Sequence, residues 1–270
     1  MQNIKVGLLG CGAMGSALVE GFSKILNSKN IYLYNRTPEK AVNLANKIGA
    51  NVVENACDLV NNNCDYIFLA VKPYAIASEI QGLFNDVNIR YTGTIISVAA
   101  GVSLDDLADC IPSYHDVSVI RLMPNTACLI GEGATGLCCN DFIDEKIVKM
   151  VVTLLEQTGL VERVSEKMLD AVTALAGSGI AYGYIFIEAL ADAGVQFGMT
   201  RQQAYKYAAQ MMVGAGKMVL KTGEHPGVLK DAVCSPGGIT IAALQTLEEK
   251  GFRGSIIAAA KTAWKVSTKK

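Results

Sequence analysis

The sequence predicts an α/β fold in which a doubly wound N-terminal sheet, residues 1–163, is followed by an all-helical domain, residues 164–270. In the first part, short apolar runs alternate with helical segments, the order that gives a parallel sheet with helices on both faces. After residue 165 one helical segment follows another, and no strand signal appears beyond residues 161–163. A chain of 270 residues suits one large or two modest domains with a sizeable core.

Each expected strand is an apolar run bounded by turn residues. The run at residues 66–71 (YIFLAV) is apolar throughout, which is typical of a central strand buried on both faces. Strands are expected at residues 4–9, 31–34, 51–53, 66–71, 94–98, 117–122 and 136–139. The helices between them are expected at residues 13–24, 37–48, 56–60 and 141–157, with another opening at Pro73.

Capping residues and glycines mark the helices of the second part. They are expected to begin near residue 165, to cover residues 180–197 and 201–220, and to begin again at Gly227, Thr240 and Gly254. Residues 171–187 form an uncharged run that approaches the length of a membrane span. Because glycines and a serine interrupt this run, we interpret it as a buried helix pair.

The composition excludes several classes of function. Lys and Arg number 24 against 25 Asp and Glu, so a net charge of −1 offers no basic surface for nucleic acid. The 8 cysteines form no C-x-x-C pair and only 2 histidines are present, so no metal site is expected. Scattered thiols and no expected signal peptide indicate the reducing cytoplasm. Hydrophobic residues make up 51% and charged residues 18%, a surplus that indicates burial between subunits.

A glycine-rich turn follows the first strand directly, at residues 10–15 (GCGAMG). In this G-x-G-x-x-G pattern Gly10 permits the tight turn, Gly12 lets a pyrophosphate approach the backbone, and Gly15 lets helix and strand pack closely. The N–H groups at the start of the next helix would hold the phosphates. The strand–turn–helix context therefore predicts a Rossmann-type domain that binds a dinucleotide.

The end of the second strand indicates which dinucleotide is bound. An NAD site is expected to carry Asp or Glu there, for the ribose 2′-hydroxyl, and this chain has Asn35-Arg36-Thr37. Arg36 offers a fork of donors for a 2′-phosphate, and Asn35 and Thr37 can add neutral hydrogen bonds. Alternatively, Thr37 caps the next helix and Arg36 is solvated, and both roles can hold at once. The pattern favours NADP(H) over NAD(H).

Three further segments follow strands at the edge where ligands bind in open α/β sheets, residues 71–73 (VKP), 97–102 (SVAAGV) and 121–126 (RLMPNT). The small residues Ala99, Ala100 and Gly101 would let a nicotinamide ring lie flat, or they form only a tight strand–helix junction. Lys72 either donates to the cofactor or is a surface lysine.

Two segments of the helical part have unusual local chemistry. Residues 174–179 (ALAGSG) place one hydroxyl among glycines, and residues 235–240 (SPGGIT) form a turn that enters a helix. Such a helix N-terminus is a carboxylate site, or an ordinary capped turn. Glu188 and Asp192 are either a buried acidic pair or, as we expect, solvated. With few acid–base groups available, the sequence favours hydride transfer to an already protonated iminium ion, for which the protein supplies position.

In order along the chain, these motifs closely resemble pyrroline-5-carboxylate reductase. The resemblance covers essentially the whole chain. It rests on the glycine turn and on residues 71–73, 97–101, 121–126, 174–182, 188–194 and 235–240. It implies reduction of L-1-pyrroline-5-carboxylate to L-proline by NAD(P)H, with NADPH expected and NADH possible. It also implies a homodimer through the helical domain, with the substrate pocket at its interface, and further assembly of dimers.

The resemblance completes the set of expected site residues. Thr240, facing the ring nitrogen, and Ser178 are the expected catalytic residues, and the substrate carboxylate is assigned to Ser235, Gly237, Gly238, Ile239 and Thr240. The expected cofactor-binding residues are Gly10, Cys11, Gly12, Ala13, Met14, Gly15, Asn35, Arg36, Thr37, Asn55, Val71, Lys72, Pro73, Ala99, Ala100, Gly101 and Pro124. Two departures from the family pattern are Ile180, where Pro is common, and Ile239, where Thr or Ala is usual and the pocket would narrow.

Two other readings remain. Another imine reductase or a β-hydroxyacid dehydrogenase would share the glycine turn, but the latter is expected to carry a catalytic Lys in its helical domain and to lack residues 235–240. A non-catalytic NADP-sensing regulator would need no carboxylate site.

Overall fold

The structure is a computed structural model that describes residues 3–85, 89–140 and 142–269. The chain forms two compact units. The first comprises Met1–Gly177 together with Val266–Lys270, and the second comprises Ser178–Lys265. The fold class is as predicted: a Rossmann-type sheet domain is followed by a helical domain.

The first unit contains an 8-stranded sheet in the order β3-β2-β1-β4-β5-β6-β7-β8. Its strands are β1 (Val6–Leu9), β2 (Ile31–Tyr34), β3 (Asn51–Val52), β4 (Tyr66–Leu69), β5 (Thr94–Ser97), β6 (Ser118–Met123), β7 (Gly133–Cys139) and β8 (Gly159–Arg163). Strands β1 to β6 are parallel, whereas β7 runs antiparallel to β6 and β8 runs parallel to β7. The chain order reverses between β1 and β4, which opens a crevice at the carboxyl ends of these strands.

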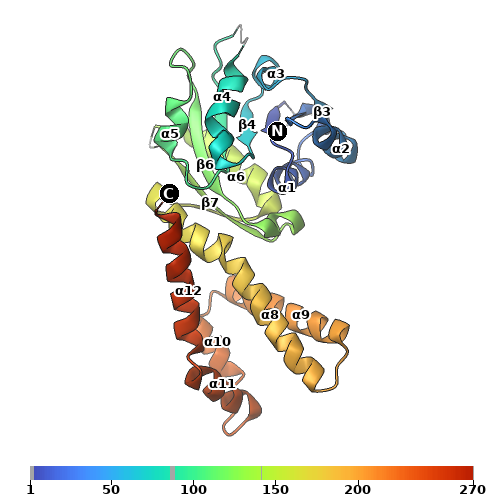
Figure 1. Ribbon diagram of the computed structural model, residues 1–270, viewed down its shortest axis with the longest axis vertical. Coiled ribbons are helices and arrows are strands. Elements are labelled where there is room, and N and C mark those ends of the chain that lie inside the picture. The colour runs from blue at the N-terminus through green and yellow to red at the C-terminus, as the bar shows by residue number, and fades with distance from the viewer. Residues whose placement is uncertain (1–2, 86–88, 141, 270) are drawn as a thin grey trace. The chain divides into compact units, whose positions relative to one another are not determined.

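Helices cover both faces of this sheet, as a doubly wound fold requires. They are α1 (Ala13–Phe22), α2 (Pro38–Ile48), α3 (Cys57–Asn61), α4 (Ile76–Phe84), α5 (Leu104–Asp109) and α6 (Glu145–Leu155). Buried side chains of α1, α2 and α6 pack on one face, and those of α3, α4 and α5 pack on the other (Figure 1). The alternate residues of β1, β2, β4, β5 and β6 contribute to the two cores in turn.

Several predicted helix ends are shifted, and each shift has a local cause. Pro73 opens a short 3₁₀ turn, Pro73–Ala75, before α4 begins. Helix α6 begins after Asp144, whose carboxylate accepts a hydrogen bond from the N–H of Lys146 at 2.8 Å. The start predicted at Asp141 lies outside the described residues. Helix α5 was not predicted, although Ser103 and Asp106 form a reciprocal capping box at its start.

An irregular helical segment ends the first unit. A 3₁₀ turn (Glu166–Met168) is followed by α7 (Leu169–Val172) and by a π-helical turn (Thr173–Gly177). This turn is the interruption that residues 174–179 predict. Such π-helical turns break the regular hydrogen-bond ladder and often occur at functional sites.

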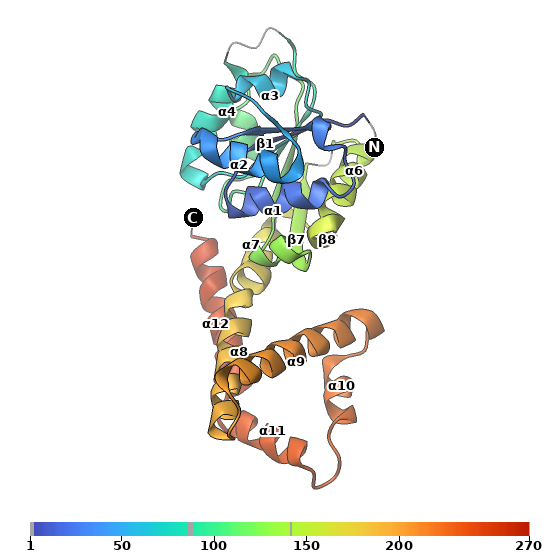
Figure 2. The same ribbon diagram turned by 90° about the vertical axis from the view of Figure 1, so that its right-hand side faces the viewer.

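The second unit consists of helices only. They are α8 (Gly179–Gln196), α9 (Arg201–Thr222), α10 (Pro226–Ala232), α11 (Ile239–Glu249) and α12 (Phe252–Ser267), the end of which returns to the first unit. Gly198 separates α8 from α9 with φ +93°, and Thr200 caps α9. Figure 2 shows α8 beside α9, with α10 and α11 leading from α9 towards α12. Three predicted starts are wrong by short distances, since α10 begins at Pro226 rather than Gly227, α11 at Ile239 rather than Thr240 and α12 at Phe252 rather than Gly254.

Few side chains are buried within the second unit itself. Among its described residues only Ala191, Gly194, Ala204 and Ala208 are buried, all of them small and all on α8 or α9. The expectation of a buried helix pair is therefore wrong for the single chain. One stretch, Glu166–Gln196, is long and apolar enough to cross a membrane by length and composition, and 11% of its apolar 18-residue window is buried. Asp192 and Glu188 are exposed, as expected, and Asp192 forms an ion pair with Arg201.

His115 is buried at 7% exposure, although the sequence places it in a polar connector. Its Nδ1 accepts a hydrogen bond from the N–H of Tyr91 at 3.1 Å, and its ring stacks on Phe84. Its Nε2 is buried without a hydrogen-bond partner among the described residues. Burial, together with the positive charge of Arg90, lowers the pKa of the His115 imidazole and favours the neutral form.

We expect the protein to lose stability faster than a His115→Gln variant as the pH falls below 6.5, the ordinary pKa of imidazole. The unfolded chain takes up a proton there while folded His115 resists it, which costs up to about 1.4 kcal/mol of unfolding free energy per pH unit. The stabilisation is complete above the unfolded pKa and is lost as the pH falls towards the lowered folded pKa. Urea unfolding of both proteins across this range measures the effect, and parallel stability curves would contradict it.

Candidate active site

One cleft of about 610 Å³ lies within the first unit, at the carboxyl ends of the central parallel strands. Many of the predicted cofactor-binding residues line it: Gly10, Gly12, Ala13, Met14, Asn35, Arg36, Thr37, Val71, Lys72, Pro73, Ala99, Ala100 and Pro124. Cys11, Gly15, Asn55 and Gly101 do not line it. The backbone N–H of Asn55 instead donates to the carboxylate of Asp58 at 2.8 Å. A volume of this size suits a cofactor.

The three glycines of the turn have different spatial roles. Gly10 has φ +106°, and a Cβ there would lie 2.5 Å from the carbonyl oxygen of Ala70. A Cβ on Gly15 would collide with the carbonyl oxygen of Gly10, so α1 packs against the end of β1 only because Gly15 lacks a side chain. A Cβ on Gly12 would meet no atom within 4 Å. The backbone at Gly12 therefore faces open space at the cleft, as the approach of a pyrophosphate requires.

Cys11, between these glycines, has a structural position. Its side chain is buried, and burial raises the pKa of its thiol to about 11. Its backbone N–H donates to Oδ1 of Asn35 at 2.8 Å. This N–H group is therefore engaged within the protein, and the thiol is protonated at neutral pH.

Cationic side chains that follow β2 and β4 line the cleft. Arg36, Lys40 and Lys72 are exposed and line the cleft, and none of them forms an ion pair with another described residue. The hydroxyl of Thr37 makes no capping hydrogen bond to α2, so it remains available to a ligand. Lys40 was not predicted as a cofactor-binding residue. It lies four residues after Arg36, in the first turn of α2, and this short spacing in the sequence could have indicated it. These groups fit a 2′-phosphate.

Exposed Tyr74 also lines the cleft and was not predicted. Its side chain is 86% exposed, which offers a flat apolar face at the opening. Glu79, Met123, Thr126 and Leu129 are further lining residues outside the predicted set.

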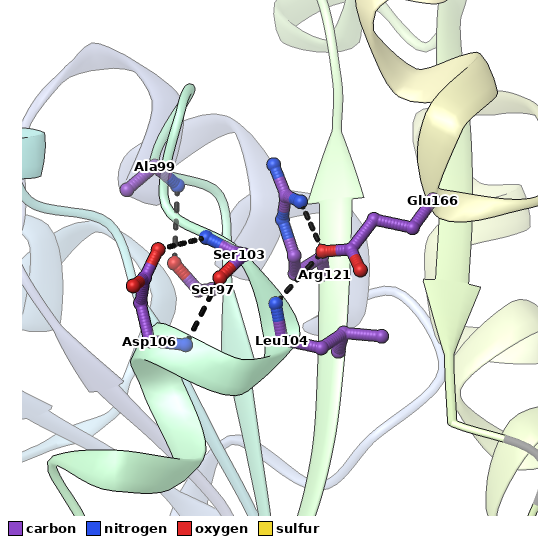
Figure 3. Close-up of polar contacts among 7 residues, drawn as sticks. All are labelled: Ser97, Ala99, Ser103, Leu104, Asp106, Arg121 and Glu166. Atoms are coloured by element: carbon purple, nitrogen blue, oxygen red, sulfur yellow. Dashed lines mark hydrogen bonds and ion pairs between the residues drawn. The ribbon is translucent and has the colours of Figure 1, made fainter. Parts of the chain in front are cut away.

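The loop between β5 and α5, which includes the small residues Ala99 and Ala100, is held from several sides (Figure 3). At one end Ser97 Oγ accepts a hydrogen bond from the N–H of Ala99 at 3.2 Å. At the other end, Ser103 and Asp106 close the capping box of α5. These contacts fix the backbone that forms one wall of the cleft.

Arg121, in the segment of residues 121–126, anchors this loop rather than lining the cleft. Its guanidinium forms an ion pair with Glu166, whose Oε1 also accepts a hydrogen bond from the N–H of Leu104 at 2.7 Å (Figure 3). The Arg121 side chain is only 12% exposed. A partly buried arginine left without its carboxylate would be costly, so this pair is a structural element.

Asn125 in the same segment is also structural. Its Oδ1 accepts hydrogen bonds from the N–H groups of Ala127 and Ala134, and its Nδ2 donates to the carbonyl oxygen of Ala176 at 3.1 Å. The amide therefore ties the end of β6 to the π-helical turn. Neighbouring Pro124 lines the cleft.

The residues assigned to the substrate all belong to the second unit. Gly237 has φ +67°, and the N–H of Gly238 donates to the carbonyl oxygen of Ser235 at 3.0 Å. Gly238, not Thr240, is the N-cap residue of α11, and no side chain caps the helix. Thr240 lies in the first helical turn, and Ile239 is 91% exposed. The first N–H groups of α11 are thus open to an anion.

The remaining candidates have simple environments. Ser178 precedes α8 and its hydroxyl does not cap that helix. His225 caps α10, since its Nδ1 accepts a hydrogen bond from the N–H of Gly227 at 3.0 Å. Within the described ranges, no group of three or more His, Cys, Asp or Glu side chains is placed to hold a metal ion.

Comparison with known proteins identifies relatives of the entire chain. The family described as "Pyrroline-5-carboxylate reductase dimerisation" matches residues 166–270, and the one described as "NADP oxidoreductase coenzyme F420-dependent" matches residues 5–101. The chain is 43% identical to pyrroline-5-carboxylate reductase of Escherichia coli (strain K12), over 94% of each chain. A pyrroline carboxylate reductase of Plasmodium falciparum with NADP bound is similar in structure, with 32% identity, a TM-score of 0.84, and 99% and 98% of the two chains covered. The corresponding enzyme of Coxiella burnetii gives 29% identity, a TM-score of 0.90 and the same coverage.

A Gly12→Ala variant is expected to fold normally and to bind a dinucleotide at least about tenfold more weakly, because the added methyl group occupies open cleft space. Its unfolding free energy should stay within about 0.5 kcal/mol of wild type. Gly10→Ala is the matched control, and it should lose more than about 1 kcal/mol through strain and the clash with Ala70. Calorimetric titration and urea unfolding measure both effects. Wild-type binding by Gly12→Ala would contradict the assigned position of the pyrophosphate.

Proposed function

The chain belongs to the pyrroline-5-carboxylate reductase family, and on that premise we propose how its residues reduce L-1-pyrroline-5-carboxylate to L-proline, the last step of proline biosynthesis. The observation that carries the function is the extent of the similarity. It covers 94% of the chain and includes both the dinucleotide-binding part and the dimerisation part. The enzyme is an NAD(P)H-dependent oxidoreductase.

The first unit supplies the cofactor site. When bound, NAD(P)H supplies a hydride from C4 of its nicotinamide. The residues around Gly12 leave space for the pyrophosphate, and the small residues Ala99 and Ala100 offer a flat wall to the nicotinamide. Arg36, Thr37 and Lys40 would hold a 2′-phosphate, which supports NADPH as the preferred reductant. Lys72, Pro73 and Pro124 complete the cleft.

The second unit supplies the substrate site. The open N–H groups at the start of α11, with the Ser235 hydroxyl beside Gly238, suit the substrate carboxylate. The Thr240 hydroxyl would face the ring nitrogen and orient C5. The Ser178 hydroxyl makes no capping hydrogen bond to α8 and would be a second polar group for the same ring. Exposed Ile239 would shape the pocket beside the carboxylate.

The chemistry needs little acid–base assistance from the protein. The substrate iminium already carries its proton, so hydride addition forms a C–H bond at C5 while the C=N electron pair moves to nitrogen. The amine then takes a further proton from solvent. Neither histidine lines the cleft or belongs to the substrate segment, which fits a site that positions the reactants rather than transferring protons.

The helical unit carries the dimerisation domain, so the functional form is a homodimer. Its exposed apolar side chains, including Tyr184, Ile185 and Tyr207, support burial against a partner subunit rather than in a membrane or on nucleic acid. We also propose that the dimers assemble further and that the protein is cytoplasmic. We further propose a boundary between the cofactor and substrate domains near residue 163, just before the dimerisation match at residues 166–270 begins.

Steady-state loss of NADPH absorbance tests the function. Fast consumption of NADPH is expected with pyrroline-5-carboxylate, and no formation of NADPH is expected when a 3-hydroxyacid is offered with NADP⁺. Turnover of the hydroxyacid would favour a β-hydroxyacid dehydrogenase. Tight NADPH binding without turnover of any imine would favour a non-catalytic sensor and contradict the proposal.

An Arg36→Ala variant is expected to bind NADPH about 10- to 100-fold more weakly, because a charge-assisted pair with the 2′-phosphate is lost. Binding of NADH should change by less than about threefold, since NADH lacks that phosphate. Fluorescence titration with both cofactors measures the two constants. Equal weakening of both would rule out the 2′-phosphate assignment.

A Thr240→Ala variant is expected to lower turnover about tenfold or more, while NADPH affinity stays within about twofold of wild type. Thr240→Ser keeps the hydroxyl and should restore most of the activity. Steady-state kinetics and cofactor titration together separate the two effects. A defect confined to cofactor binding would show that Thr240 has another role.

A further inference from the structure

Asn35 joins the two loops that meet the cofactor in the proposed function. Its Oδ1 accepts a hydrogen bond from the N–H of Cys11 in the glycine turn, at 2.8 Å. Its Nδ2 donates to the carbonyl oxygen of Thr37, at 2.9 Å. One planar amide therefore connects the turn after β1 with the loop after β2, and both of these loops line the cleft.

This connection continues the pairing of β1 and β2 beyond the ends of the strands. The ladder ends at the pair Leu9 and Tyr34, and the N–H of Gly10 then donates to the carbonyl oxygen of Tyr34 at 2.9 Å. At the next position, Cys11, the acceptor is the Asn35 side chain instead of a backbone carbonyl. The side chain thus supplies a bond at a place where the two backbones have separated.

The chemistry of the two partners fixes the orientation of the amide. A backbone N–H requires an acceptor and a carbonyl oxygen requires a donor, and the Asn35 amide satisfies both with its separate oxygen and nitrogen atoms. An aspartate at this position would accept from Cys11 and would repel the carbonyl oxygen of Thr37. Asn35 is half-buried, and both of its polar atoms are engaged within the protein. One N–H of Nδ2 is left for a 2′-phosphate, the partner that the sequence suggested.

We propose that Asn35 is a positioning residue that holds the glycine turn and the Arg36–Thr37 loop in register, and so controls affinity for the dinucleotide as a whole. Arg36 is then the residue that reads the 2′-phosphate. This inference rests on the proposed cofactor site. It separates two neighbouring residues by function: one is needed for any dinucleotide, and the other for NADP(H) alone.

Binding constants for NADP⁺ and NAD⁺, measured by calorimetric titration without substrate, test this separation. Asn35→Ala should weaken both ligands by a similar factor, about tenfold, because both hydrogen bonds that shape the turn are lost. The matched control, Arg36→Ala, should weaken NADP⁺ alone. Thermal unfolding without ligand shows whether each variant is folded.

Asn35→Asp provides a second variant that keeps the acceptor for the Cys11 N–H and adds a negative charge near Arg36. It should bind NAD⁺ better than Asn35→Ala does, and NADP⁺ worse than wild type. Loss of NADP⁺ binding alone in Asn35→Ala would make Asn35 a direct 2′-phosphate ligand and overturn the proposal. Unchanged binding of both ligands would also overturn it. Wild-type protein that binds neither dinucleotide would instead contradict the cofactor site itself.

Discussion

The close approach of α1 to the end of β1 is the constraint on which the first unit depends. It exists because Gly15 has no side chain, and a Cβ there would strike the carbonyl oxygen of Gly10. The missing side chain of Gly10 in turn lets the end of β1 approach Ala70, which follows β4. The turn that results leaves the backbone at Gly12 facing open space beside the crevice between β1 and β4. Strand order then brings the loops after β2, β4, β5 and β6 around that same space. A cofactor cleft follows from sheet topology and two missing side chains.

Polar residues around the cleft divide into those that hold its walls and those that face a ligand. Arg121 and Glu166 form an ion pair with each other, and Glu166 also accepts a hydrogen bond from the backbone. The side chains of Asn125 and Asn35 form hydrogen bonds with backbone groups. Arg36, Lys40 and Lys72 remain exposed in the cleft without ion pairs among the described residues. Preorganised walls allow exposed cations to act on a ligand without rearrangement, which lowers the cost of binding.

Sequence patterns predicted the parts of the structure that local physics determines. The central strands are apolar because both faces are buried, and the glycine turn follows from the backbone conformation it needs. The reversal of β7 and β8 depends on contacts distant in the chain, and the six-residue helix α5 is too short for a periodic signal. The hydrogen bonds of Asn35 to the backbone could not be predicted either. An asparagine that follows a strand can bind a ligand or the backbone, and the sequence is the same in both cases. The prediction that residues 171–187 are buried was wrong for a single chain. The side chains that bury an apolar helix can come from a second subunit, and this segment belongs to the dimerisation match.

Transfer of label from the cofactor to the substrate shows directly whether this protein delivers a hydride to pyrroline-5-carboxylate. The protein would be incubated with pyrroline-5-carboxylate and NADPH carrying deuterium on one or the other face of nicotinamide C4, and the product would be analysed by mass spectrometry and NMR. Proline with a single deuterium at C5 is expected from one of the two labelled cofactors. Unlabelled proline from both cofactors, or recovery of the unchanged imine, would contradict it.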